Sequence, residues 1–519
     1  MLNRLLFFAG IFPVMMFIYA CSALDSHSAG AAENIRLAAL FRNGMVLQRN
    51  KEIPVWGWCE PGARVKVGFL AQTVSAVAGK DGRWEAVLAP VPACGPVKMT
   101  VSGQNTIVID NVMVGEVWLC AGSSDMSRKL FACDDAEDDI RRANNSRIRL
   151  FLTDGSGGGE WIPLAHKNAG NFPAIAFYFA QDIYKYTTGV ALGIILAAGE
   201  SPGIKNWLPG SEVWNTLLKP LVPGAMKGVI WYHGGDIAGC NDDFKRLQIN
   251  MIESWRRAWR DDALAFITVQ LPNYGQQWPV PQDSQLAKFR ESQIAATQLP
   301  DVGCVVAIDL GGDKKTLRLD NERETGRRMA LQAASVAYDM KMLYGRTLVP
   351  GGPVFDSMRI EDGAIFVKFN NALHGLVSHD GKELRHFAIA GKDGKYHWAK
   401  AEISGQDEVK VWNVLVKEPI NVRYAWADNP LDCNLFNRNG FPVAPFRTDK
   451  DWIVVPSAFR QYYGAGRSRI SFIGQLGIIR VQIIFERLPA HPVGGTLLFN
   501  RSYIHIYRSD VFESTFAQP

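Results

Sequence analysis

The alternation of hydrophobic and polar residues divides most of the chain into three zones. From residue 35 to about residue 111, short alternating runs are separated by turn signals and helical periodicity is absent. This pattern is typical of a small β-sandwich. The same alternation returns in residues 345–449 and predicts a second sandwich-like β domain. In the first zone we expect Trp56, Trp58 and Trp84 in the core rather than on a sugar-stacking surface.

Residues 112–344, the zone between the two predicted β domains, alternate between helix and strand patterns. Three segments place apolar residues on one helical face: residues 173–186, 244–259 and 326–337. Apolar, β-prone runs accompany them: residues 190–197, 228–232, 265–271 and 303–310. This zone is therefore predicted to be an α/β domain with a mostly parallel sheet covered by helices on both faces. Ligands of such sheets bind at the carboxyl ends of the strands.

A turn with two serines follows the apolar run that opens this zone. Residues 114–121 read as a buried strand, and Gly122 permits backbone angles that are closed to other residues. Two interpretations are open from the residues alone. A serine exposed at this turn could act as a nucleophile, or Ser123 and Ser124 could cap the next helix.

Several ordered motifs resemble those of one family, the sialate O-acetylesterases, a branch of the SGNH (GDSL-like) hydrolases. The motifs lie at residues 40–48, 54–58, 114–126, 227–232, 269–273 and 422–427, and the resemblance covers about residues 35–449. It implies an SGNH-type hydrolase domain at residues 112–344. It also implies hydrolysis of O-acetyl esters on sialic acid or related glycans, with Ser124 at the position of the nucleophile.

The blocks that carry the family's chemistry depart from its pattern at the base and at one oxyanion donor. The family's orienting aspartate and catalytic histidine align with Thr316 and Arg318, counted back from the helix beginning Gly326-Arg-Arg328. An arginine stays protonated and cannot act as a base. Ile237 stands where relatives carry the asparagine that donates to the oxyanion, and its side chain has no donor.

Other positions in these blocks keep a backbone role or add charge. The family's backbone oxyanion donors align with the N–H groups of Ser124, Gly199, Glu200 and Ser201. Asp125 replaces the usual asparagine. Asp125, and Glu200 if it faced the pocket, would bring negative charge to a site that must stabilise another.

Two residues have competing interpretations in this setting. His233, which aligns with a glutamine of the family, is the nearest candidate for a substitute base, but a structural hydrogen bond is the simpler role. Arg318 could bind the carboxylate of a sialic acid or uronate, or it could form a surface salt bridge.

Three functions therefore stay open. The chain could be a carbohydrate O-acetylesterase, impaired or inactive through the loss of its histidine and aspartate. It could be a non-catalytic, exported glycan-binding pseudoenzyme, or a structural exported β-rich protein. The replaced blocks favour the second, whereas the family resemblance favours the first.

The two ends of the chain carry different signals. Residues 1–32 have a positive flank and an apolar core at residues 5–20, typical of an export signal. Cys21 is a candidate lipid-anchor site and residues 29–31 are a competing cleavage site. We expect an exported protein: periplasmic, an outer-membrane lipoprotein or extracellular. No later run is long enough to span a membrane. Residues 450–519 contain strand-like runs, but we assign them no function.

Composition narrows the range of partners. The net charge of +5 on 519 residues is spread along the chain, so we predict no nucleic-acid partner. The eight cysteines form no C-x-x-C pair, so we predict no metal site and no cofactor. The family resemblance implies O-acetylated sialic acid or another acetylated glycan as the partner.

Overall fold

The computed structural model describes residues 34–153, 159–199, 203–234, 243–311 and 317–449, together with the backbone of three short strands, residues 470–476, 479–485 and 503–508. The described residues up to 449 belong to one compact unit and the three short strands belong to a second. The predicted export segment, residues 1–32, lies outside the described residues. None of the described helices is long and apolar enough to cross a membrane.

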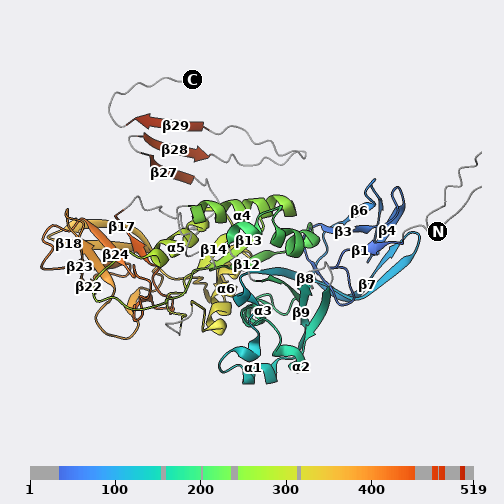
Figure 1. Ribbon diagram of the computed structural model, residues 1–519, viewed down its shortest axis with the longest axis horizontal. Coiled ribbons are helices and arrows are strands. Elements are labelled where there is room, and N and C mark those ends of the chain that lie inside the picture. The colour runs from blue at the N-terminus through green and yellow to red at the C-terminus, as the bar shows by residue number, and fades with distance from the viewer. Residues whose placement is uncertain are drawn as a thin grey trace, which may run out of the picture. The chain divides into compact units, whose positions relative to one another are not determined.

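The N-terminal zone forms strands only, as predicted (Figure 1). They are β1 (Arg36–Leu37), β2 (Val46–Gln48), β3 (Ile53–Trp58), β4 (Arg64–Phe69), β5 (Gln72–Val77), β6 (Arg83–Leu88) and β7 (Cys94–Ser102). One sheet has the order β1-β3-β6, and β5, β4 and β7 lead into the central sheet. Trp56 and Trp84 are buried and Trp58 is half-buried against the core, which confirms their predicted place.

Strand β8 (Thr106–Gly122) joins this zone to the α/β domain. Its first part pairs antiparallel with β7, and its second part pairs parallel with two strands of the central sheet. The predicted domain boundary after residue 111 therefore falls inside one strand. Asn111 has a φ of 57°, and the pairing with β7 shifts register nearby, so the strand changes partners where its backbone departs from regular geometry.

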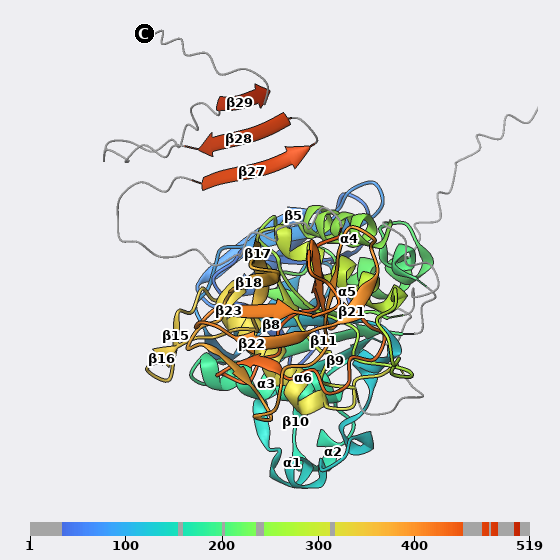
Figure 2. The same ribbon diagram turned by 90° about the vertical axis from the view of Figure 1, so that its left-hand side faces the viewer.

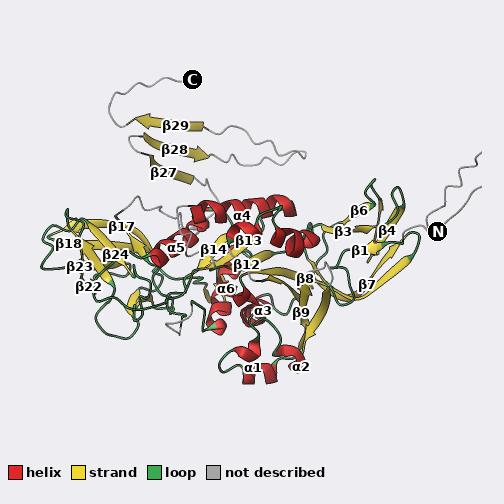
Figure 3. Cartoon of the chain, in the orientation of Figure 1, coloured by secondary structure: helices red, strands yellow, loops and turns green. Residues whose placement is uncertain are grey.

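The central sheet has the order β10-β9-β11-β8-β12-β13-β14. Figure 3 labels five of these strands, β8, β9, β12, β13 and β14. Its other strands are β9 (Asn145–Thr153), β10 (Gly159–Leu164), β11 (Leu192–Ala198), β12 (Gly228–Tyr232), β13 (Ala265–Val269) and β14 (Val302–Val305). Neighbouring strands along the series β9-β11-β8-β12-β13-β14 pair in parallel. Strand β10 pairs antiparallel with β9. The fold is thus α/β with a mixed sheet. Strand β14 is shorter than predicted because the chain turns after it, with the Leu310 N–H donating to the Ala307 carbonyl.

Helices cover both faces of this sheet. They are α1 (Glu137–Arg142), α2 (His166–Ala169), α3 (Ala174–Tyr186), α4 (Asp243–Trp259), α5 (Gln285–Ile294) and α6 (Glu322–Val336). Trp118 of β8 packs on Phe179 of α3 at 5.0 Å between ring centroids, and Trp231 of β12 packs on Trp255 of α4 at 5.7 Å. Trp231 pairs with Ala121, three residues after Trp118, so the two tryptophans point to opposite faces. Figure 1 shows α3 and α4 on opposite sides of the sheet.

Helix α6 begins four residues before the predicted start and packs closely on α3. The Asn321 side chain accepts a hydrogen bond from the Glu324 N–H at 2.9 Å and so caps the helix at its N-terminus. A Cβ atom on Gly326 would lie 2.7 Å from the Tyr178 Cβ and 2.8 Å from the Ile175 carbonyl. Glycine at this position lets the two helices approach each other.

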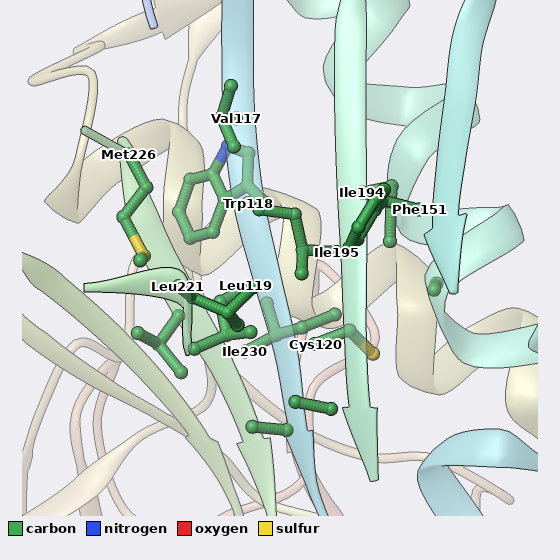
Figure 4. Packing of buried hydrophobic residues seen from close by; sticks show 14 of the residues in the cluster. Val117, Trp118, Leu119, Cys120, Phe151, Ile194, Ile195, Leu221, Met226 and Ile230 are labelled. Atoms are coloured by element: carbon green, nitrogen blue, oxygen red, sulfur yellow. The ribbon is translucent and has the colours of Figure 1, made fainter. Parts of the chain in front are cut away.

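The hydrophobic core centres on β8 and its neighbours (Figure 4). Trp118, Leu119 and Cys120 are fully buried there, beside Ile194 of β11 and Ile230 of β12. A polar network lies among the buried strands. Gln48 donates to Glu116 at 3.0 Å and accepts from the Val117 N–H at 2.9 Å, so a residue of the 40–48 motif anchors β8 from the side.

Residues 345–449, the C-terminal β region, form small antiparallel sheets around a second core (Figure 2). The strands after the central sheet are β15 (Met342–Leu343), β16 (Arg346–Thr347), β17 (Val354–Glu361), β18 (Ala364–Asn370), β19 (Leu376–Ser378), β20 (Phe387–Ala390), β21 (Tyr396–Trp398), β22 (Lys400–Ile403), β23 (Glu408–Trp412), β24 (Asn421–Tyr424), β25 (Leu435–Asn437) and β26 (Phe446–Arg447). The main sheets have the orders β17-β18-β23-β22 and β21-β20-β24-β26. These strands confirm the second β zone. The second unit pairs β27 (Ile470–Leu476), β28 (Ile479–Phe485) and β29 (Tyr503–Arg508) antiparallel.

Candidate active site

The serine turn lies at the carboxyl end of β8. Gly122 has a φ of 130°, and a Cβ atom there would come within 2.0 Å of the Tyr232 carbonyl oxygen, so only glycine fits between the two strands. The Ser123 N–H donates to that same carbonyl at 2.9 Å. A short 3-10 helix, η1 (Ser124–Ser127), follows at once.

The two serines of this turn differ in exposure. Ser124 is exposed, whereas the Ser123 hydroxyl is buried. Neither supplies a side-chain cap for η1: Ser123 stands at the cap position without a side-chain hydrogen bond. Ser127 instead donates to the Ser124 carbonyl at 2.6 Å and closes the turn. Of the two hydroxyls, the one at position 124 is therefore placed to meet a ligand.

Charged side chains after η1, before α6 and at the start of α6 interact electrostatically with Asp125 of the serine turn. Burial raises the pKa of the Asp125 carboxyl, while the nearby cations Arg318 and Arg128 act in the opposite direction. Arg318 pairs with Asp320 at 3.3 Å, and Arg128 pairs with Glu322. Arg318 is thus near enough to the serine turn to interact electrostatically with Asp125. That position 318 is the one of the family's catalytic histidine stays a prediction.

The pairing of Arg318 bears on its two predicted roles. Its side chain is 42% exposed and its guanidinium faces carboxylates of its own chain, Asp320 by direct contact and Asp125 through the electrostatic interaction. The contact with Asp320 is the salt bridge predicted as the alternative to carboxylate binding by Arg318. A carboxylate ligand would have to compete with both acidic groups.

His233 follows directly after β12 and is buried. It is 1% exposed, and its ring stacks on Trp231 with 5.6 Å between ring centroids. Trp231 faces α4, and His233, two residues further, points to the same face. The ring therefore sits beside the tryptophan cluster under α4, which favours the structural interpretation. Its role as a substitute base stays a prediction.

The predicted oxyanion donors are described only in part. The Gly199 N–H donates to the Gly122 carbonyl at 3.2 Å, so this group already extends the parallel ladder between β8 and β11. Glu200, Ser201, Ile237 and Thr316 lie outside the described residues, and their roles stay predictions. Among the described residues, no group of three or more His, Cys, Asp or Glu could hold a metal ion.

Sequence reasoning missed three members of this site: Arg128, Asp320 and Glu322. Asp320 is two residues from Arg318, and that short spacing was a usable signal. Arg128 and Glu322 are 194 residues apart, and they meet only because η1 and the start of α6 come to the same edge of the sheet. No local pattern in the sequence could predict that pair.

Comparisons with known proteins agree with this architecture. Residues 114–335 match the family model described as carbohydrate esterase, sialic acid-specific acetylesterase. The mouse sialate O-acetylesterase is 22% identical, over 84% of this chain and 97% of its own, and the human enzyme is 22% identical, over 80% and 93%. The crystal structure of a carbohydrate acetylesterase from Xanthomonas citri is 33% identical, covers 80% of this chain and 100% of its own, and has a TM-score of 0.74. The chain belongs to the sialate O-acetylesterase family of carbohydrate esterases.

Proposed function

We propose that this protein binds acetylated glycans through an SGNH-type domain and that its acetylesterase activity is very low or absent. The observation that carries the proposal is the placement of Arg318 beside the serine turn, where a working esterase of this family needs a base. The similarity to a sialate O-acetylesterase and to a carbohydrate acetylesterase supports an acetylated glycan as the ligand class.

The chemistry of the turn supports loss of hydrolysis. Ester cleavage by Ser124 needs a group that accepts its proton, and a guanidinium stays protonated at working pH. Asp125 and Asp320 hold that guanidinium in place by opposite charge. A hydrogen-bond donor to the oxyanion is expected to be missing as well, because Ile237 stands where relatives carry the donating asparagine. One such donor contributes about 2.7–4 kcal/mol to the transition state.

A working carbohydrate O-acetylesterase is the second candidate. The exposed Ser124 at a strand end favours it, because that is where a nucleophile belongs in such a sheet. In that case His233 or a group outside the described residues would have to serve as base. A purely structural role is the third candidate, and the described site offers no observation in its favour.

Hydrolysis of a chromogenic acetate ester and of acetylated sialic acid, by the full protein and by Ser124→Ala, tests the proposal. We expect the two proteins to be equally slow. A rate in the usual enzyme range of about 1–10³ s⁻¹ that disappears in Ser124→Ala would establish a working esterase.

We further propose that the protein is exported under the direction of residues 1–32, with either lipidation at Cys21 or cleavage near residues 29–31. The apolar core at residues 5–20 behind Arg4 supports this. Mass spectrometry of the mature N-terminus distinguishes a diacylglyceryl cysteine from a free amine after residue 31, and an intact Met1 would contradict both.

A further inference from the structure

We propose that a second pocket, between the α/β domain and the C-terminal β region, binds a neutral oligosaccharide. A cavity of about 400 Å³ lies there. Its walls come from four segments: residues 277–284, 384–387, 398–399 and 426–432. None of them includes the serine turn or the segment around Arg318. The proposal shares with the proposed function only the carbohydrate class of the ligand and does not require hydrolysis.

Two tryptophans mark this cavity. Trp278 is 49% exposed and Trp398 is 37% exposed. Among the described residues, no other tryptophan is as exposed as these two. Large apolar rings left in water at the mouth of a cavity indicate a ligand that covers them. The ring face of a tryptophan matches the C–H face of a pyranose, while the polar groups that line the cavity meet hydroxyls.

The charges of the cavity select against an acidic sugar. Asp283, Asp428 and Asp432 line it, against a single lining arginine, Arg385. Arg385 is held by Asp380 at 2.6 Å, and Lys288 pairs with Asp283. The carboxylates that line the cavity thus outnumber the lining arginine, and the buried Arg290 behind the wall interacts with one of them, Asp428. Carboxylates accept hydrogen bonds from sugar hydroxyls but repel the carboxylate of a sialic acid or uronate.

The cavity is preformed. Trp398 donates from Nε1 to the Pro279 carbonyl at 2.9 Å, and Gln277 donates to the Leu431 carbonyl at 2.9 Å. Asn429 donates to the Gly275 carbonyl at 2.5 Å. These bonds fix the loop after β13 on the C-terminal β region before any ligand arrives. A ligand then binds without the entropic cost of ordering the walls.

The position of the loop suits a polymeric ligand. It leaves the carboxyl end of β13, and Ser124 follows the carboxyl end of β8, which runs parallel to β13 in the same sheet. The pocket is thus built on the edge of the sheet where the ester site belongs. A glycan chain held by its sugar residues in this pocket would carry its substituents along that edge.

The test is calorimetric titration of Ser124→Ala protein, so that no turnover enters the measurement. Cellohexaose and mannohexaose are the neutral probes, and a galacturonic acid hexamer and a sialic acid trimer are the anionic ones. We expect a neutral probe to bind, Trp278→Ala to raise its Kd about tenfold or more, and Trp278→Phe to keep most of the affinity. Tyr344→Ala removes an aromatic ring that is 72% exposed outside the pocket and should change nothing.

Binding of no neutral probe up to about 10 mM would overturn the proposal. So would neutral binding that Trp278→Ala leaves unchanged, or tighter binding of an anionic probe than of both neutral ones. The titration does not depend on ester cleavage, so its result is independent of the esterase assay. A protein with full hydrolytic activity could fail to bind a neutral probe, and an inactive protein could bind one.

Discussion

The side chain at position 318 decides what the serine turn can do. Arg318 pairs with Asp320 at 3.3 Å and interacts electrostatically with Asp125, so acidic groups of its own chain oppose its charge without a ligand. A base at this place would have to be neutral at working pH, and arginine is not. If position 318 is that of the family's base, as the resemblance implies, the residue there is a cation that cannot accept the serine proton.

Asp125 should make stability depend on pH. Burial raises its pKa in the folded protein, so the folded state holds this proton above the ordinary carboxyl pKa of about 3.9, where the unfolded chain has released it. Stability therefore falls as pH rises from that value through the folded pKa. Asp125→Asn removes this loss. We expect its Tm relative to the parent to be higher at pH 7 than at pH 4.

The matched control is Asp262→Asn, which removes one exposed carboxylate elsewhere. Its Tm difference from the parent should stay nearly constant between the two pH values. Should Asp125→Asn show its larger gain at pH 4, the sign of the Asp125 effect would be the reverse of the one inferred from burial.

His233 should matter for packing rather than for chemistry. Replacement by glutamine, the family's own residue, loses the stack on Trp231 in a buried site. We expect His233→Gln to lower the free energy of unfolding by about 1 kcal/mol in urea titrations. Any Ser124-dependent hydrolysis that the protein retains should be unchanged. A variant that keeps its stability but loses that hydrolysis would instead identify His233 as the base.

Helix α6 is tied to the segment after β14 by one buried arginine. Arg328, inside this helix, is buried and binds both carboxylate oxygens of Asp309, at 2.8 and 2.7 Å, and Glu324 at 2.8 Å. It also donates to the Val306 carbonyl at 2.9 Å. One side chain thus ties the segment after β14 to α6. These contacts explain how the helix can keep its place although the residues before it have changed.

Arg328→Met should therefore be strongly destabilising. Removing one partner of a buried ion pair leaves the Asp309 carboxylate without its cation, which typically costs about 3–5 kcal/mol. Arg327→Met is the control, because Arg327 pairs with the same Glu324 but is 39% exposed; we expect about 0–1 kcal/mol there. Equal losses for both variants in denaturant titrations would mean that the Asp309 contact contributes little.

The elements with a clear apolar stripe were predictable, and those that bury polar groups were not. α3 and α4 follow the predicted ranges within one residue at each end. α5 escaped prediction because Arg290 and Gln293 occupy buried positions on it. Arg290 donates to the Leu271 and Ala427 carbonyls, and Gln293 bonds with the Leu271 N–H, so their polarity is satisfied by backbone. Such residues hide the helical period.

The candidate site also contains residues that a local sequence pattern predicts and residues that only the tertiary fold brings together. Ser124 and Arg318 were predictable, because each is fixed by a motif nearby in sequence, the strand ending at Gly122 and the helix containing Gly326. The pairing of Arg128 with Glu322 was not, since it depends on how η1 and α6 meet. The second pocket, lined by Trp278 and Trp398, could not be predicted either, because its walls come from segments up to about 150 residues apart.

At the scale of the whole molecule, the described scaffold around the site is complete. The glycine at the end of β8, the helices on both faces and the buried Arg328 network are all present. By the family resemblance, the expected replacements are at Ile237, Thr316 and Arg318, and of these only Arg318 is among the described residues. Because the described scaffold is present, we predict that the chemistry could be restored without rebuilding the fold.

The variant Thr316→Asp, Arg318→His, Ile237→Asn should gain Ser124-dependent esterase activity. Each change alone should do little, because a histidine without its orienting carboxylate and oxyanion donor lacks the rest of the unit; the gains should be strongly non-additive. The control is the same variant with Ser124→Ala. A triple variant that folds by circular dichroism yet hydrolyses neither a simple acetate ester nor acetylated sialic acid would contradict the alignment of Arg318 or the openness of the site.

The most direct measurement is the steady-state rate of acetate release from acetylated sialic acid by the purified, full-length protein, beside Ser124→Ala prepared in the same way. With an arginine in place of the base, we predict that the two rates coincide. A parent rate of about 1 s⁻¹ or more that falls to background in Ser124→Ala would contradict the loss of catalysis and would show that another group takes the serine proton.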